Sequence, residues 1–124
     1  MHFALRSCIL VVGGEAMIEN FDFDPATTSF EWDEEKEQTN FRKHGIHFKT
    51  AAKVFWDPYK LIREDAEHPE ELRYDVLGMV GKVLFVVCTV REHEKENVVR
   101  LISARIATAA EKARYMYGDE DENE

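Results

Sequence analysis

Arginines in predicted strands are the residues of this chain best suited to chemistry. Arg73 lies in the run LRYDVLGM, Arg91 ends the run VLFVVCTVR, and Arg105 follows VVRLISA just before a predicted helix. A guanidinium group can bind two phosphate oxygens through charge-assisted hydrogen bonds, and a strand holds its base in place. Three such groups meeting at one point would stabilise the negative charge of a reacting phosphate. The pattern therefore predicts a clamp made of Arg73, Arg91 and Arg105.

Strand alternation limits how these arginines could meet. Arg73 and Asp75 share one face of their strand, and Thr89 and Arg91 share one face of the next strand. Whether these two faces are the same depends on the pairing register, which the sequence leaves open. For each arginine alone, the alternative is a surface ion pair, for which Asp75 or Glu92 is available.

Arg100 and Arg105 occupy one predicted strand and lie five residues apart. Period-two geometry sends them to opposite faces of the sheet, so we expect at most one of them to serve a given site. Arg105 is preferred because a rigid helix start follows it. Thr108 and Glu111 have the spacing of a capping box, in which a hydroxyl and a carboxylate satisfy backbone amides at a helix N-terminus.

Two further residues could transfer protons. His44 closes a predicted helix and, as a histidine, could act as a general acid or base near neutral pH. Its alternative role is to cap that helix by contacting carbonyl groups. Glu71 stands at the entrance to the strand of Arg73 and is a second candidate base, with a solvated loop carboxylate in HPEE as the alternative.

The predicted helix before Gly45 also carries a basic surface with little apolar content, made of Lys36, Arg42 and Lys43. Such a surface suits salt-dependent contacts with a nucleic-acid backbone, or it is simply a solvated helix face. Tyr115, in the last predicted helix, could stack on a base or donate a proton. Its alternative role is packing beside the helix end.

Two predicted helices precede the main strands. After the short strand FEW, Asp33 is placed to cap a helix that runs to about His44 and stops at Gly45. A second helix begins near His47 and ends before Pro58, since proline disfavours helix in the residue before it. Its apolar positions follow helical spacing and are Phe48, Ala51, Ala52 and Phe55.

Strand patterns follow the second helix. The runs KLIRE, LRYDVLGM, KVLFVVCTVR and VVRLISAR are separated by polar or glycine-containing segments. Consecutive strands of this kind predict an antiparallel meander, and the nearly all-apolar third run is its central strand. The expected fold class is α+β, with two N-terminal helices packed on an antiparallel β-sheet and a C-terminal helix.

The net charge of −9 is unevenly distributed. Residues 1–35 hold eight acidic side chains against one basic, and residues 118–124 hold five acidic side chains. Residues 36–117 carry fifteen Lys or Arg against twelve Asp or Glu, so this part could still contact a polyanion. We expect one domain over 30–117, an N-terminal extension over 1–29 that need not be fully ordered, and a disordered acidic tail over 118–124.

Other patterns exclude several classes of protein. Cys8 and Cys88 lie far apart, and Cys88 falls in an apolar run, which predicts a buried thiol rather than a disulfide or zinc framework. The sequence contains no glycine-rich phosphate loop, GxSxG motif or paired-cysteine metal spacing. The N-terminal apolar run is too short to span a membrane. We expect a cytoplasmic protein that uses no cofactor or metal.

Several motifs, taken in order, resemble the BrnT family. FEWDEEKEQTNFRKHGIHF, AAKVFWDP, VLFVVCTVRE and RLISARIATAAEKARY follow one another as they do in that family, over about residues 30–115. The resemblance implies a RelE-like fold and the toxin of a type II toxin–antitoxin pair, which cuts RNA and inhibits translation. It also implies a BrnA-like ribbon-helix-helix antitoxin as partner, DNA contact only through that antitoxin, and an assembly of two toxins with two antitoxins.

Metal-independent RNA cleavage needs a base, cations and an acid. Under this interpretation, His44 or Glu71 transfers protons, Arg73, Arg91 and Arg105 hold the scissile phosphate, and Lys36, Arg42, Lys43 and Tyr115 bind RNA. The alternative is a catalytically degenerate module that binds the antitoxin and assists repression of the operon. Ile106 favours this alternative, because members of the family often carry lysine at that position.

Overall fold

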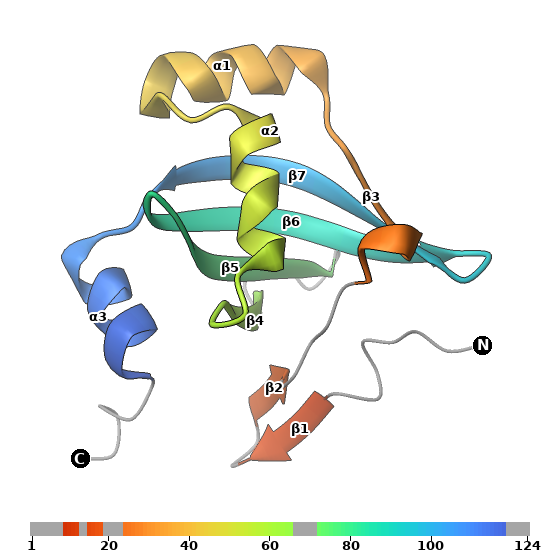
Figure 1. Ribbon diagram of the computed structural model, residues 1–124, viewed down its shortest axis with the longest axis vertical. Coiled ribbons are helices and arrows are strands. Elements are labelled where there is room, and N and C mark those ends of the chain that lie inside the picture. Colours follow the sequence, from red (N-terminus) through yellow and green to blue (C-terminus); the bar gives the residue numbers. More distant parts are fainter. Residues whose placement is uncertain (1–8, 13–14, 19–23, 66–71, 119–124) are drawn as a thin grey trace.

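The computed structural model describes residues 9–12, 15–18, 24–65 and 72–118 of the chain. Its strands and helices are β1 (Ile9–Val12), β2 (Glu15–Ile18), η2 (Pro25–Thr27), β3 (Thr28–Glu31), α1 (Glu34–His44), α2 (Phe48–Ala51), η3 (Ala52–Trp56), β4 (Leu61–Asp65), β5 (Arg73–Val80), β6 (Lys82–His93), β7 (Glu96–Ile106) and α3 (Ala109–Tyr117). The elements form one sheet with helices at its face, edge and end (Figure 1). The α+β class predicted from the sequence is confirmed.

The sheet is mixed rather than purely antiparallel. Its strand order is β1-β2-β4-β5-β6-β7-β3, and β4 to β7 form the antiparallel meander that the strand patterns predict. The exception is β3, which runs parallel to β7. The short run TSFE carries no signal for its partner, and it adds to the edge of β7 that the meander leaves unpaired. This pairing places Glu31 beside Arg100.

The ends of α1 follow from local chemistry. Asp33 caps the helix by accepting a hydrogen bond from the backbone N–H of Lys36, at 3.0 Å. Three basic side chains crowd the last turn, and Gly45 ends the helix with a φ of 72°, a left-handed conformation that costs glycine little. These features set the helix ends, but α1 has only one buried side chain, that of Asn40.

Asn40 connects α1 to the sheet. Its side chain accepts a hydrogen bond from the N–H of Ala104 (3.1 Å) and donates to the carbonyl groups of Ala104 (2.9 Å) and Ile46 (3.0 Å). Ala104 lies on β7 beyond the four residues that β3 covers. The carboxamide therefore satisfies the edge of β7 as a neighbouring strand would.

The segment after His47 is helical but changes type. Four residues form α2, and the chain then tightens into the 3-10 helix η3, which ends at Trp56 and is followed by Asp57 and Pro58. Glu37 of α1 accepts a hydrogen bond from the N–H of Phe48 (2.8 Å), which satisfies one amide at the start of α2. The two helices are thereby linked through their polar ends.

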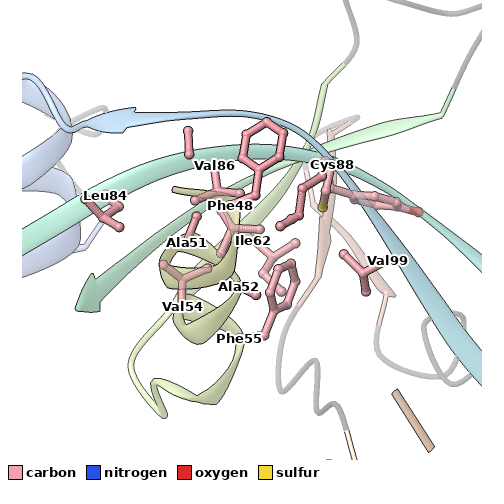
Figure 2. Close-up of a cluster of buried hydrophobic side chains, with 14 of the residues drawn as sticks. Phe48, Ala51, Ala52, Val54, Phe55, Ile62, Leu84, Val86, Cys88 and Val99 are labelled. Atoms are coloured by element: carbon pink, nitrogen blue, oxygen red, sulfur yellow. The ribbon is translucent and has the colours of Figure 1, made fainter. Parts of the chain in front are cut away.

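The hydrophobic core lies between α2 with η3 and one face of the sheet (Figure 2). Its largest fully buried side chains are Phe48, Phe55, Leu84, Leu101, Val54, Val76, Val86, Val99 and Cys88. Cys88 is a free thiol at 0% exposure, as its apolar run predicted. Gly78 allows the close approach of η3, because a Cβ at that position would lie 2.7 Å from Cβ of Val54.

β6 and β7 form a long hairpin across the middle of the sheet. Its turn consists of Glu94 and Lys95, whose φ angles are 53° and 70°. Both residues have a left-handed backbone conformation. This conformation matches the twist of a tight hairpin but is unfavourable for residues other than glycine or asparagine.

Two predicted regions fall only partly within this description. The N-terminal extension contributes β1 and β2, which pair with each other, and β2 also pairs with β4. Residues 119–124, most of the predicted acidic tail, lie outside the described residues. Within the described residues, no helix is long and apolar enough to cross a membrane.

Candidate active site

The predicted strand arginines lie on the face of the sheet opposite α2 and η3. Residues 76, 86 and 88 are buried in the core, and the alternating residues of the same strands point the other way. Asp75 pairs with Val87 of β6 and with Arg63 of β4, so the register joins these residues into one face. We call this the arginine face. It comprises Arg63, Arg73, Asp75, Thr89, Arg91, Arg100 and Arg105. The pairing register thus shows that Arg73 and Arg91 share one face of the sheet, which strand alternation alone could not decide.

A bulge in β7 brings Arg100 and Arg105 to the same side. The pairing register shifts between Val87 and Cys88, which leaves Ile102 as an extra residue in β7. The buried residues of this strand are Asn97, Val99, Leu101 and Ala104. Their spacing changes from two to three at the bulge, so both arginines lie opposite the core. The expectation that Arg100 and Arg105 lie on opposite faces is therefore wrong, because strict alternation cannot anticipate a bulge.

Arg105 is held by three kinds of contact. Its Nη1 and Nη2 donate to the two carboxylate oxygens of Glu111, at 2.8 and 2.9 Å, and its Nη1 also donates to the carbonyl of Ile106. Its guanidinium lies 4.2 Å from the ring centroid of Phe85, within cation–π range. The hydrogen bond from Arg105 lowers the pKa of Glu111 despite the opposing effect of burial. Arg105 is thus fixed as a cation on the arginine face.

Glu111 also completes the predicted capping box of α3. Its carboxylate accepts from the N–H of Thr108 at 2.9 Å, and its own N–H donates to the Thr108 hydroxyl at 3.1 Å. One carboxylate therefore anchors Arg105 and caps the helix that follows.

Arg91 and Arg100 converge on one acid. Each donates from Nη1 to Oε2 of Glu31, at 3.1 and 3.2 Å respectively. The hydrogen bond from Arg91, with the added contribution of Arg100, lowers the pKa of Glu31 despite partial desolvation. The side chains of Arg91 and Arg100 are 61% and 45% exposed, so this cluster lies at the solvent-facing rim of the arginine face.

Asp75 is a half-buried carboxylate on the arginine face, between Arg63 of β4 and Val87 of β6. Burial, and then the negative charge of Asp65, raise its pKa to about 6. Glu111 acts in the same direction, whereas Arg63 and Arg114 oppose the shift. A carboxyl group that titrates near neutral pH beside arginines has the properties of a general acid or base.

Arg73 belongs to the described residues, whereas Glu71 does not. Arg73 begins β5, two residues from Asp75 on the same face, and its side chain is half-buried and engaged in interactions. Alternation along an ideal strand separates two such Cα atoms by roughly 7 Å. Glu71 lies outside the described residues, so its role as a base stays a prediction.

Four of the predicted site residues lie on α1. His44 is exposed at the C-terminal end of the helix, and Lys36, Arg42 and Lys43 are also exposed. Lys36 and Arg42 line a shallow surface hollow with Asp33, Glu35, Gln38 and Thr39. Within the described part of the chain, no hydrogen bond or ion pair joins these four residues to the arginine face.

Tyr115 is held by a hydrogen bond. Its hydroxyl donates to Oδ2 of Asp57 at 2.5 Å, and burial together with this bond raises the pKa of Tyr115. Asp57 also accepts from the N–H groups of Tyr59 (2.9 Å) and Met79 (2.8 Å). Burial would raise the pKa of Asp57, but these hydrogen bonds outweigh it and the pKa is lowered. The contact fastens α3 to the turn after η3.

Asp75, Arg100 and Glu31 belong to this arrangement but were not predicted as site residues. A signal for Asp75 was present, because it alternates with Arg73. Arg100 was set aside because of the bulge, and Glu31 joins the cluster only through the parallel pairing of β3 with β7. Among the described residues, no group of three or more His, Cys, Asp or Glu side chains could hold a metal ion.

Fold and site together define a small α+β domain that gathers arginines and one neutral-titrating carboxyl group on a single sheet face. A protein-family model described as "Ribonuclease toxin, BrnT, of type II toxin-antitoxin system" matches residues 32–111. The chain therefore belongs to the BrnT family of ribonuclease toxins, and the resemblance seen in the motifs is confirmed.

Two further comparisons concern solved structures and curated protein sequences. The 1.1 Å crystal structure of the Brucella abortus ribonuclease toxin BrnT matches with 25% sequence identity and a TM-score of 0.46, covering 66% of this chain and 99% of that one. No curated protein sequence matches this chain.

Proposed function

We propose that this chain is the toxin of a type II toxin–antitoxin pair and cleaves RNA without a metal ion, with the arginine face as its active site. The observation that carries the proposal is the register that gathers Arg73, Arg91, Arg100 and Arg105 with Asp75 on one face. Guanidinium groups suit the charge of a pentacoordinate phosphate, and Asp75 supplies a group able to exchange a proton near neutral pH.

The reaction would form one bond to phosphorus and break another. Ionised Asp75 accepts the proton of an RNA 2′-hydroxyl, the 2′-oxygen bonds to the neighbouring phosphorus, and the bond from phosphorus to the 5′-oxygen breaks. A protonated acid, for which His44 is the sequence candidate, gives its proton to the leaving 5′-oxygen, and Glu71 is the alternative base. The products are a 2′,3′-cyclic phosphate and a 5′-hydroxyl end. Arg73 and Arg105 neutralise the phosphorane, and Arg91, at the rim of the arginine face, binds the RNA backbone beside it.

The rest of the proposal concerns RNA and partners. Lys36, Arg42 and Lys43 would guide the RNA backbone along α1, and Tyr115 would contact RNA at the rim. The fold would be RelE-like, and cleavage would inhibit translation in the cytoplasm. The antitoxin expected for this family would be a BrnA-like ribbon-helix-helix protein that forms a two-plus-two assembly and makes the DNA contacts.

The test is cleavage of an end-labelled single-stranded RNA by the purified chain in EDTA. Asp75→Asn should lower the rate by on the order of 10²- to 10⁴-fold, as for a lost proton-transfer group, and Arg73→Ala should lower it by removing charge stabilisation of the phosphorane. Lys53→Ala is the matched control, because Lys53 is exposed on η3 across the sheet. A 2′-O-methyl substrate must resist cleavage. Wild-type rates in Asp75→Asn would remove Asp75 from the mechanism.

The pH dependence of cleavage separates the candidate bases. If ionised Asp75 is the base, the rate should rise with pH and level off above pH about 6, since that is where its carboxyl group titrates. Asp75→Asn should abolish this limb of the profile, whereas His44→Ala should leave it in place. Loss of the limb only in His44→Ala would assign the base to His44 instead.

One observation favours a second function, a non-catalytic module that binds the antitoxin and assists operon repression. Arg105 is paired with Glu111, Arg91 and Arg100 are paired with Glu31, and Ile106 occupies the position where lysine is frequent in the family. Expression without an antitoxin distinguishes the two functions. Growth arrest that Arg73→Ala relieves supports the toxin, and full tolerance of the wild-type chain supports the binding module.

A further inference from the structure

The contact of Arg91 and Arg100 with Glu31 leaves most of both guanidinium groups unused. Each arginine donates only through Nη1, and both bonds reach the same oxygen, Oε2 of Glu31. A guanidinium group has five N–H donors arranged as a fork. Within the described residues, the remaining donors of Arg91 and Arg100 have no acceptor, so two forks from neighbouring strands share one single-point contact.

We propose that Arg91 and Arg100 form a binding subsite for a phosphodiester group of single-stranded RNA, and that the Glu31 carboxylate is an internal occupant which the phosphate displaces. This inference rests on the proposed function, since it takes RNA as the ligand. It adds Arg100 to the binding residues and gives Glu31 a role in limiting RNA affinity.

The geometry fits exchange of one anion for another. A phosphodiester offers two anionic oxygens that can each face one fork, whereas the carboxylate engages both arginines through one oxygen. The Glu31 side chain is 35% exposed and both arginines are more exposed, so incoming RNA can reach the contact. An ion pair this exposed stabilises the fold only slightly, so displacing Glu31 costs the fold little.

The place of the subsite suits a phosphate next to the reacting one. Arg100 pairs with Thr89 on β6, and Arg73 precedes Tyr74, which pairs with Cys88 on the other side of β6. Two neighbouring strand spacings separate Arg73 from Arg100 by about 10 Å between backbones. The subsite therefore lies on the same face as Asp75 but at its rim, beside the proposed centre of the reaction.

The test is the affinity of a fluorescent 2′-O-methyl oligouridine, which binds but cannot be cut, for the full chain at two or more salt concentrations. Glu31→Gln should tighten binding by roughly tenfold at low salt and steepen the salt dependence by about 0.7 in the log–log slope, as for one added phosphate contact. Adding Arg91→Ala or Arg100→Ala to Glu31→Gln should cancel the gain. Glu94→Gln is the matched control, because it removes one charge at the nearby hairpin tip.

The outcomes are distinct. Tighter binding by Glu31→Gln but not by Glu94→Gln supports the subsite, even if the wild-type chain cuts no RNA and the proposed function fails. Unchanged RNA affinity in a folded Glu31→Gln variant overturns the subsite, even if cleavage is normal. Equal gains in both variants would reduce the effect to net charge and also overturn it. A gain confined to a poly-glutamate peptide would assign the arginine pair to a protein partner and reject the RNA assignment.

Discussion

The side chain of Asn40 satisfies backbone hydrogen-bonding groups at the edge of β7, as a neighbouring strand would. Its carboxamide donates to and accepts from the backbone of Ala104 and also holds the carbonyl of Ile46. The side chain is 5% exposed, so the partners it satisfies lie away from water. A buried backbone group that loses its partner carries the full cost of desolvation.

Asn40→Ala should therefore lower the free energy of unfolding by about 2–4 kcal/mol, because it leaves buried donors and acceptors unpaired. Urea denaturation followed by circular dichroism measures the change. Gln38→Ala is the control, since Gln38 is exposed on the same helix and should change stability little. Equal midpoints for the two variants would show that water replaces the Asn40 contacts.

The single-residue view also shows how far the sequence describes the site. Arg73, Arg91 and Arg105 were predicted to converge. The register places them on one face, and their meeting at one phosphate stays a prediction. Asp75 was considered only as an ion-pair partner, because its raised pKa depends on burial and on Asp65 and Glu111, which come from other elements. A titration behaviour created by tertiary neighbours leaves no trace in local sequence.

At the scale of elements, α3 is attached by polar contacts at both ends. Its N-terminal turn is held by the Thr108–Glu111 capping box and by Arg105, and Tyr115 near its other end donates to Asp57. None of its residues is fully buried. The position of α3 thus depends on a few polar bonds together with the packing of Tyr115 against the small cluster of Leu77, Val83 and Ala107.

Glu111→Gln should destabilise the fold by about 1–2 kcal/mol, because it weakens both the cap and the bidentate bond to Arg105. The measurement is the midpoint of thermal unfolding at neutral pH, with Lys112→Ala as the control on the exposed side of the same helix. An unchanged midpoint would mean that α3 contributes nothing to cooperative unfolding.

The boundaries of elements were more predictable than their partners. Asp33, Gly45 and the Thr108–Glu111 pair act on adjacent backbone groups, so the ends of α1 and the start of α3 could be recognised from spacing. The bulge at Ile102 and the parallel pairing of β3 depend on strands distant in sequence. The alternation of side chains along a strand therefore predicts which residues share a face only up to the next bulge.

For the molecule as a whole, stability depends on pH through two kinds of acidic group, those whose pKa is lowered on folding and one whose pKa is raised. Glu31, Glu37, Asp57 and Glu111 have pKa values lowered below their ordinary 4.5 or 3.8, so their stabilisation is present above those values and is lost as pH falls through the folded pKa. Asp75 behaves oppositely. Its pKa rises from 3.8 to about 6, so the native state binds its proton more tightly and stability falls as pH rises between these values.

Asp75→Asn should therefore gain stability relative to wild type as pH rises from about 4, with most of the gain reached by pH about 6 and little further change above it. The measurement is the difference between the two thermal unfolding midpoints across this range. The subtraction cancels other titrating groups, such as the histidines. A constant difference would mean that the pKa of Asp75 is the same in the folded and unfolded chain.

The left-handed turn of Glu94 and Lys95 bears on how fast this molecule folds. β6 and β7 pair along almost their whole length, so closing this hairpin is the obvious local step in building the sheet. The turn opposes that step, because each left-handed residue other than glycine costs roughly 1–2 kcal/mol. Asn-Gly at positions 94 and 95 should raise the refolding limb of a chevron plot, which means faster folding, and leave the unfolding limb nearly unmoved, if the hairpin forms before the barrier. Folding would then be slowed by a nucleation step set by two residues at the tip of the β6–β7 hairpin, outside the hydrophobic core.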